Sequence, residues 1–244
     1  MIVADVNNIS RVHGGRTIFR GLSWSLQDGE KIGLIGPSGC GKSTLMRVLA
    51  GEDTVDAGAV TFRRGAKVAY LPQEFTGTPG RAAIDELIAG HTELHALEAR
   101  IHDAEQRLGD PEVLDNPARF DAVMLEHERL LKEYADIGGP MLQNRAEGLL
   151  RGLGLEEEAW QHSMELLSGG QRKIVGIARC LLGEPDLLLL DEPDNHLDLA
   201  RKAMLERVIR DFPGALIVIS HDRYLLDETV GVIMELEPNR ELGV

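Results

Sequence analysis

The sequence predicts an α/β protein with a mostly parallel central sheet. Apolar strand candidates alternate with amphipathic helix candidates near both ends of the chain, as at 31–51 and 186–220. Two of the strand candidates, at 187–190 and 215–219, are continuously apolar, which is typical of strands buried on both faces. Because 43% of the 244 residues are hydrophobic, the chain can fill a core.

Composition narrows the possible functions. The net charge is −14, so the chain lacks the excess of Lys and Arg that general nucleic-acid binding requires, and we expect no DNA partner. The two cysteines form neither a CxxC pair nor a disulfide framework. The first 15 residues do not resemble a signal peptide, and the longest apolar runs are too short to span a bilayer. We therefore expect a soluble protein of the reducing cytoplasm.

The first 73 residues read mainly as short strands. Apolar and polar residues alternate there, and glycine-containing pairs at 14–15, 28–29 and 64–65 predict turns. The predicted order is strands at 1–6, 16–26 and 31–36, a helix at 44–50 that stops at Gly51, and two strands within 59–73.

The spacing changes between 84 and 137, where apolar residues recur every three or four positions. Two such arms flank the breaker GDPEVLDNP at 109–117, and Gly-Gly-Pro at 138–140 ends the second arm. This pattern predicts an antiparallel helical hairpin of coiled-coil type. Its apolar positions are Leu87, Leu94, Leu97, Ile101, Ala104 and Leu108 in the first arm, and Phe120, Val123, His127, Leu130, Tyr134 and Ile137 in the second.

The last hundred residues again mix helices with strands. This alternation supports the parallel sheet. The predicted helices are 141–153, 156–162, 170–182 and about 199–211, and the predicted strands are 186–193, 215–220 and 230–237.

The segment GPSGCGKST at 36–44 fits the phosphate-loop pattern G-x-x-x-x-G-K-[ST]. Its glycines let backbone amides turn toward phosphate oxygens, Lys42 supplies positive charge, and the Ser43 hydroxyl can ligate Mg²⁺. A strand before and a helix after are the context that this loop needs. The alternative is a glycine-rich turn with a chance lysine.

Polar side chains follow three of the predicted strands. Asp191 and Glu192 end the strand at 186–193, where ligands of open α/β sheets bind, so Asp191 could order a magnesium shell and Glu192 could act as general base. Gln73 could contact metal and water, and His221 could hold the γ-phosphate. Taken alone, an apolar strand ending in Asp-Glu is common, and Gln73 and His221 fit solvated strand ends better.

A second anion site is predicted at SGGQ, residues 168–171. Ser168 can cap a helix whose first backbone amides are bare, an arrangement that suits phosphate. The alternative is an ordinary capped helix start.

The motifs together resemble the ATP-binding cassette (ABC) ATPases over nearly the whole chain. Their order is the phosphate loop at 36–43, Gln73, the signature LSGGQ at 167–171, the acidic strand at 187–192, HLD at 196–198 and His221. The resemblance implies a P-loop NTPase cassette with an antiparallel β subdomain and a helical subdomain that carries the hairpin. It implies one domain over 1–244, divided into a nucleotide-binding core (1–80 and 170–244) and a helical subdomain (81–169).

The resemblance also implies the site residues and a partner. In this family two cassettes pack head to tail, so that the signature of one contacts the ATP held by the other. The implied catalytic residues are Glu192, His221 and Gln73, and the implied Mg²⁺ ligands are Ser43, Gln73 and Asp191. The implied ATP contacts are His13, Gly36, Pro37, Ser38, Gly39, Cys40, Gly41, Lys42, Ser43 and Thr44, with Ser168, Gly169, Gly170 and Gln171 serving the ATP of a partner.

DNHLD at 194–198 and SHDRYLLD at 220–227 resemble the ABC-F branch, which lacks membrane subunits and mostly acts on ribosomes. The 95 positions between Gln73 and Ser168 leave room for the helical arm of that branch, or for an enlarged helical subdomain of the general kind. The implied function is ATP-driven closure of two cassettes in translation or antibiotic resistance, with the ribosome as a candidate partner. The alternative is the nucleotide-binding subunit of a transporter, docked on a membrane subunit.

Three features depart from the ABC-F pattern. Asp194 stands where Thr is usual, and His13 stands where Tyr commonly stacks on adenine. The sequence ends at Val244 without a second cassette, so we expect either a piece of a two-cassette protein or a half-size protein that forms a homodimer. In addition, residues 82–145 carry 14 acidic and 6 basic residues, which favours a protein-facing or solvated arm over one that contacts RNA.

Overall fold

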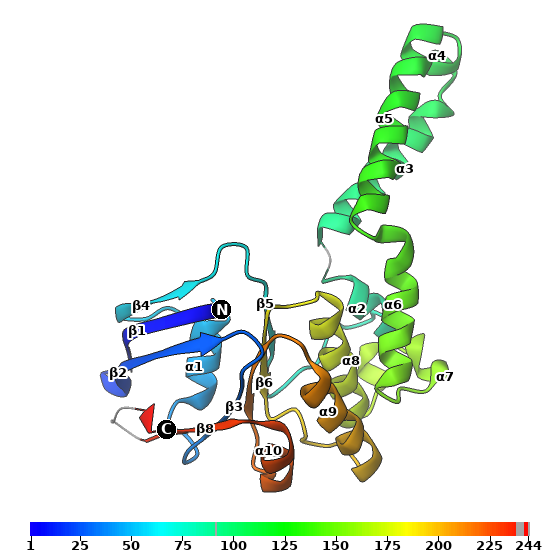
Figure 1. Ribbon diagram of the computed structural model, residues 1–244. Helices are drawn as coiled ribbons and strands as arrows, with labels where there is room; N and C mark the ends of the chain where they lie inside the picture. Colours follow the sequence, from blue (N-terminus) through cyan, green and yellow to red (C-terminus); the bar gives the residue numbers. More distant parts are fainter. Residues whose placement is uncertain (91, 238–241, 244) are drawn as a thin grey trace.

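The computed structural model describes residues 1–90, 92–237 and 242–243. Its larger sheet has six strands in the order β5-β6-β7-β3-β8-β9, parallel except for β9, which runs antiparallel to β8. This confirms the mostly parallel sheet (Figure 1). The strands are β3 (Lys31–Ile35), β5 (Val68–Leu71), β6 (Leu187–Asp191), β7 (Ala215–Ile219), β8 (Val232–Leu236) and β9 (Leu242–Gly243).

A smaller antiparallel sheet has the order β2-β1-β4. It contains β1 (Ile2–His13), β2 (Arg16–Gln27) and β4 (Ala57–Phe62). The two strands predicted within 59–73 therefore belong to different sheets, since β4 pairs with β1 and β5 pairs with β6. A turn between neighbouring strands does not decide whether they pair with each other, because each can find its partner elsewhere.

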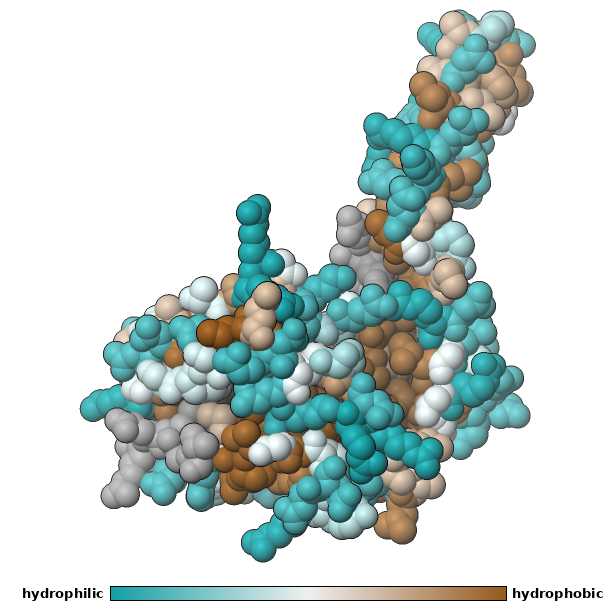
Figure 2. Space-filling view, viewed as in Figure 1, coloured by the Kyte–Doolittle hydropathy of each residue, from teal (hydrophilic) through white to brown (hydrophobic). Residues whose placement is uncertain are grey.

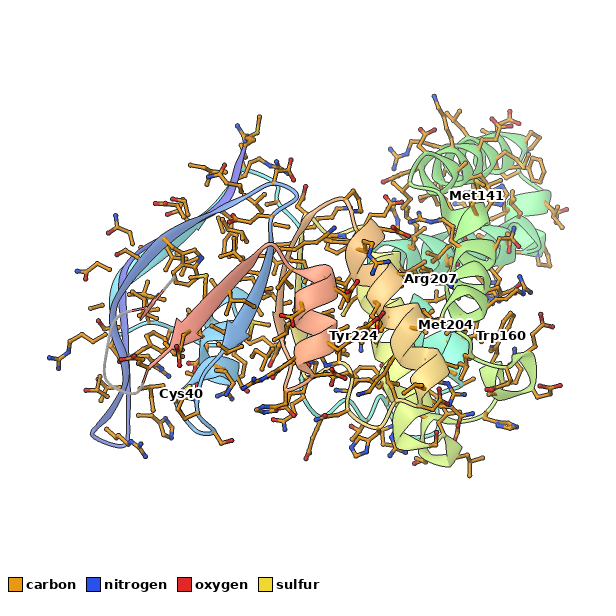
Figure 3. All side chains as sticks on the ribbon, turned by 60° about the horizontal axis from the view of Figure 1, so that its bottom comes forward. Cys40, Met141, Trp160, Met204, Arg207 and Tyr224 are labelled. Atoms are coloured by element: carbon orange, nitrogen blue, oxygen red, sulfur yellow. The ribbon has the colours of Figure 1, made fainter. Side chains whose placement is uncertain are left out.

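The core sheet is buried on both faces, as its continuous apolar strands predicted. Leu187 and Leu189 of β6 pack in the cluster formed with the small sheet and α1 (Lys42–Leu49), whereas Leu188 and Leu190 pack against helices on the opposite face. This split follows from the period of two in a strand. Figure 3 shows the two layers, with Cys40 near α1 and Met204 and Trp160 beyond the sheet.

The opposite face is covered by helices from several parts of the chain. They share one apolar cluster in which α8 is central, with Ile174, Val175 and Ile177 fully buried. The elements on this side are α2 (Ala83–Ile88), α6 (Gly139–Gly152), α7 (Glu157–Trp160), the 3-10 helix η1 (Met164–Leu166), α8 (Gly169–Leu182), α9 (Leu199–Asp211) and α10 (Arg223–Thr229).

A helical hairpin projects from this layer (Figure 1). It consists of α3 (Thr92–Leu108) and α5 (Pro117–Asp136), joined by a loop with the short helix α4 (Pro111–Leu114). The hairpin has a small core of its own, made of Leu97, Ile101, Ala104, Val123 and Leu130.

The predicted hairpin start at residue 84 is wrong. Ile84 and Leu87 lie in the separate helix α2, and with Leu94 they pack in the main core. At the other end, Ile137 lies beyond α5 and is 39% exposed. A helix shows apolar residues every three or four positions whichever surface it packs against. The spacing therefore did not distinguish the helix that packs on the main core from the helices that pack on each other in the hairpin. None of the helices in the described parts of the chain combines the length and the hydrophobicity that a transmembrane span needs.

Candidate functional site

The phosphate loop connects the end of β3 to the start of α1, as predicted. Gly36 has φ 148° and Gly41 has φ 108°, values that other residues rarely adopt. A Cβ on Gly36 would lie 2.4 Å from the carbonyl oxygen of Leu236, and one on Gly41 would lie 2.3 Å from Cγ2 of Ile18. Both positions therefore require glycine. Pro37, Ser38 and Gly39 are exposed, Ser43 and Thr44 are half-buried, and Cys40 is buried.

Lys42 lies across the loop at the first position of α1. Only 8% of it is exposed, and its Nζ donates hydrogen bonds to the carbonyl oxygens of Gly36 (2.8 Å) and Pro37 (3.1 Å). The positive charge is thus fixed within the loop, beside the backbone amides that would face phosphate oxygens.

Asp191 is the last residue of β6 and is 1% exposed. Its Oδ2 accepts a hydrogen bond from the Tyr70 hydroxyl (3.4 Å), and its Oδ1 has no partner within the described part of the chain. Burial raises the pKa of this carboxyl, and the Ser43 hydroxyl opposes that shift. The orphaned buried oxygen and the neighbouring Ser43 hydroxyl are hard oxygen donors of the kind that Mg²⁺ prefers, and the predicted third ligand, Gln73, has an oxygen of the same kind.

The Glu192 carboxylate is held by groups from three segments. Its Oε2 accepts hydrogen bonds from Gln73 Nε2 (3.0 Å) and Asn195 Nδ2 (2.5 Å), and its Oε1 lies 3.5 Å from His221 Nε2. The Glu192 backbone has φ 48°, an unusual value for a residue with a side chain and one that often occurs at functional sites. The structure therefore brings together Gln73, Glu192 and His221, which the sequence predicted separately.

Sheet order explains this convergence. Strands β5, β6, β7 and β3 are neighbours and run parallel, so their carboxyl ends share one edge of the sheet. Asp191 ends β6, and Gln73, Glu192, His221 and the phosphate loop each follow one of these strands. This edge is where open α/β sheets bind ligands.

Two site residues were missed by sequence reasoning. Asn195 donates to Glu192, although its motif DNHLD was used only to recognise the branch. Tyr70 donates to Asp191 from the end of β5, and burial followed by the Asp191 charge raises the pKa of its hydroxyl. A tyrosine near the end of a strand, two positions before Pro72, was the available indication.

The signature segment forms a capped helix start at some remove from α1 (Figure 1). The Ser168 Oγ accepts from the Gln171 amide (3.2 Å), and the Gln171 side chain accepts from the Ser168 amide (2.9 Å). A Cβ on Gly170 would lie 2.6 Å from the carbonyl oxygen of His196, so glycine lets α8 pack against the loop after Glu192. Gly169 also lies beside the His196 ring.

Asp194 and His13 occupy different surroundings. Asp194 is 7% exposed, its Oδ2 lies 4.0 Å from Lys202 Nζ, and its Oδ1 has no partner among the residues described. His13 is exposed at the end of β1, beside the turn at 14–15. Its predicted contact with adenine stays a prediction.

A glycine loop between β3 and α1, with acids at the end of a neighbouring parallel strand, defines a P-loop nucleotide-binding protein. The family model described as "ABC transporter" matches residues 19–195, and the chain belongs to this family of ATP-binding cassettes.

Three curated relatives are similar over most of this chain. The chain is 36% identical over 237 residues to the probable ATP-binding protein YheS of Escherichia coli K12. This match covers 97% of the chain and 34% of YheS. It is 37% identical over 222 residues to the energy-dependent translational throttle protein EttA of Haemophilus influenzae, and this match covers 91% of the chain and 39% of EttA. It is 36% identical over 234 residues to the tylosin resistance ATP-binding protein TlrC of Streptomyces fradiae, and this match covers 96% of the chain and 42% of TlrC.

All three relatives are ABC-F proteins, which confirms the branch that the motifs predicted. The chain spans about a third to two fifths of their length. Among solved structures, the dimeric bacterial ABC transporter cassette MJ0796 matches with a TM-score of 0.69 and 19% identity, covering 99% of this chain and 97% of MJ0796. This match confirms the cassette fold.

Proposed function

We propose that this chain is an ATPase cassette that binds ATP with Mg²⁺ and hydrolyses it in partnership with a second cassette. The observation that carries the proposal is the placement of Glu192. Its carboxylate is held by the Gln73 and Asn195 amides and lies next to His221, at the sheet edge that also carries the phosphate loop. This is the arrangement that a general base for water requires.

Each residue of the site has a distinct role in the proposed reaction. The loop amides of 36–44 and Lys42 bind the β- and γ-phosphates. Ser43, Asp191 and Gln73 would hold Mg²⁺, which when bound supplies positive charge to the phosphate oxygens. Glu192 accepts a proton from water as the water oxygen bonds to the γ-phosphorus. The bond to the bridging oxygen breaks, ADP departs with that electron pair, and His221 orients the γ-phosphate.

The signature segment serves a second cassette. Ser168 and Gly170 begin a helix of 14 residues whose N-terminal amides suit phosphate, on a different part of the molecule from its own phosphate loop. The partner is a second copy of this chain or a further cassette of a longer protein. The dimeric state of the similarly folded MJ0796 cassette supports this arrangement.

The relatives suggest the process in which the cassette works. EttA is named for throttling translation and TlrC for tylosin resistance, and we propose a role in one of these two processes, in the cytoplasm and with the ribosome as target. Closure on ATP and release after hydrolysis would be the output.

Replacing the general base tests the proposal. Glu192→Gln should still bind ATP but hydrolyse it far more slowly, so that an ATP-dependent dimer accumulates. Size-exclusion chromatography with light scattering measures that dimer. Glu128→Gln, the same change on an exposed position of the hairpin, is the matched control and should behave as the wild type. Normal turnover by Glu192→Gln would remove Glu192 from the reaction, and unchanged ATP binding by Lys42→Ala would remove the phosphate-loop assignment.

A further inference from the structure

A buried lysine joins the signature helix to the catalytic loop. Lys173 lies on α8, two positions after the signature, and only 4% of it is exposed. Its Nζ donates hydrogen bonds to the backbone oxygens of Gln73 (2.7 Å) and Pro72 (3.3 Å). None of the roles proposed above uses this residue.

Removing this ammonium from water is unfavourable, and the nearby carboxylates offset that cost only in part. Loss of hydration lowers the pKa of Lys173, and the charges of Asp191, Glu192 and Asp194 act against that shift. Its neighbours on α8, Ile174 and Val175, are fully buried apolar residues, and a side chain of that kind would pack here without desolvating a charge. The lysine is therefore better explained by what it holds than by packing.

The contacts of Lys173 continue to the catalytic base. Gln73 is exposed and follows the end of β5, and its side chain donates to Glu192 Oε2 at 3.0 Å. A connected path thus runs from the start of α8 through Lys173 to the Gln73 backbone, and from the Gln73 side chain to Glu192. In the described residues, no other side chain donates to the Gln73 carbonyl.

We infer that Lys173 is a positioning residue that couples the signature helix to Gln73 and, through it, to the Glu192 carboxylate. This inference rests on the proposed ATPase function. A phosphate bound at 168–171 acts on the N-terminus of α8, and Lys173 transmits the resulting shift of the helix to the loop that holds the general base. The cassette therefore adjusts its own catalytic glutamate according to the nucleotide held by its partner.

The test combines substitutions at both ends of the contact. Lys173→Met keeps a long apolar stem but removes the donors, and should lower kcat about 10- to 100-fold with KM for ATP nearly unchanged, because small misplacements of a catalytic group have costs of that order. Lys173→Arg should restore much of the rate. The loss in the double variant Lys173→Met/Gln73→Ala should be smaller than the product of the two single losses, because both changes act on one path, although Gln73→Ala also removes a Mg²⁺ ligand.

Hydrogen exchange gives a readout that does not need turnover. Amides of 73–78 should exchange faster in Lys173→Met and at the normal rate in Lys173→Arg. Lys31→Met is the matched control, because Lys31 also donates to a backbone carbonyl, that of Arg210, away from the site. If Lys173→Met does not fold, Lys173→Gln is compared with Lys173→Arg in the same way.

The two proposals fail in different ways. Independent, multiplicative effects of Lys173→Met and Gln73→Ala on kcat, or unchanged kcat and exchange in Lys173→Met, overturn the coupling while the ATPase assignment stands. If Lys42→Ala and Glu192→Gln both leave turnover unchanged, the ATPase assignment itself fails, and the exchange experiment still decides whether Lys173 fixes the loop.

Discussion

At the scale of single residues, Asp191 illustrates a conflict between stability and function. Burial raises the pKa of its carboxyl above the usual value of 3.8 in the folded state. Between these two pKa values the folded state binds more protons than the unfolded state, so the free energy of unfolding falls as pH rises through that window. At neutral pH the ionised carboxylate therefore destabilises the nucleotide-free protein.

We predict that Asp191→Asn raises the Tm of the nucleotide-free protein at pH 7 and abolishes the dependence of ATP binding on Mg²⁺. Calorimetry measures the first effect and ATP titration with and without Mg²⁺ the second. Asp121→Asn, at an exposed position of α5, is the control and should change neither quantity. A lower Tm for Asp191→Asn at pH 7 would contradict the burial argument.

Cys180 provides a second test of burial. Desolvation raises the pKa of its thiol to about 12, so almost no thiolate is present at pH 8. We predict that iodoacetamide at pH 8 leaves Cys180 unmodified in the native protein and alkylates it after unfolding in urea, as read by mass spectrometry. Rapid native labelling of Cys180 would show that α8 opens locally.

Sequence patterns located residues that the structure places together at one edge of the core sheet, whereas the chemical roles of these residues stay predictions. The glycines and lysine of 36–43 and the acids at 191–192 belong to short local patterns. Lys173 and Tyr70 could not be assigned in this way, because their partners lie about a hundred positions away in the chain. Their roles arise only when the sheet brings β5 next to β6 and α8 against the loop at 72–73.

At the scale of elements, the start of α8 depends on the reciprocal bonds of Ser168 and Gln171. We predict that Ser168→Ala lowers the free energy of unfolding by about 1 kcal/mol, measured by urea titration, because an N-cap acceptor is lost. Ser168→Asp keeps an acceptor and should retain most of the stability, yet its negative charge should weaken ATP-dependent dimerisation. Equal stability of Ser168→Ala and the wild type would contradict this role of the cap.

The hairpin should respond to mutation independently of the cassette core. Leu130 is fully buried in the separate cluster between α3 and α5. We predict that Leu130→Ala destabilises the hairpin by about 2–5 kcal/mol, so that amides of α3 and α5 exchange faster while those of β6 and β7 do not change. Leu190→Ala, in the main core, should instead accelerate exchange throughout. Uniform acceleration in Leu130→Ala would show that the two clusters unfold together.

The spacing of apolar residues shows that a segment is helical, but it does not show which surface the helix packs against, and this limited the prediction of the helices. The two helices of the hairpin were recognised from their spacing and from the breaker between them. The short helix α4 inside that breaker, and the start of α5 at Pro117, were not predicted. The separation of α2 from the hairpin was missed, because both segments repeat their apolar residues at the same interval.

At the scale of the whole molecule, negative charge limits the possible partners. Figure 2 shows a mostly hydrophilic hairpin surface in this view, with apolar patches toward its end. We predict no binding to a random DNA duplex at about 0.15 M salt, measured by fluorescence anisotropy, because the chain carries a net charge of −14. Tight, salt-sensitive binding would reveal a local basic surface that outweighs the total charge.

The overall architecture was predictable as a class but not as a topology. Alternating helices and strands indicated a parallel sheet, and the resemblance supplied the cassette. Sequence patterns did not reveal that β3 lies between β7 and β8, or that β4 leaves β5 to join β1. Strand order is decided by which apolar faces the intervening helices can cover, and this depends on contacts distant in sequence.

The independent core of the hairpin also bears on how such proteins diversify. Because α3 and α5 are stabilised mainly by each other, insertions, deletions or new side chains toward their far end need not disturb the machinery that consumes nucleotide. Natural selection can therefore change the length and the surface of the hairpin, and with them the partner that it contacts, while the nucleotide site stays the same.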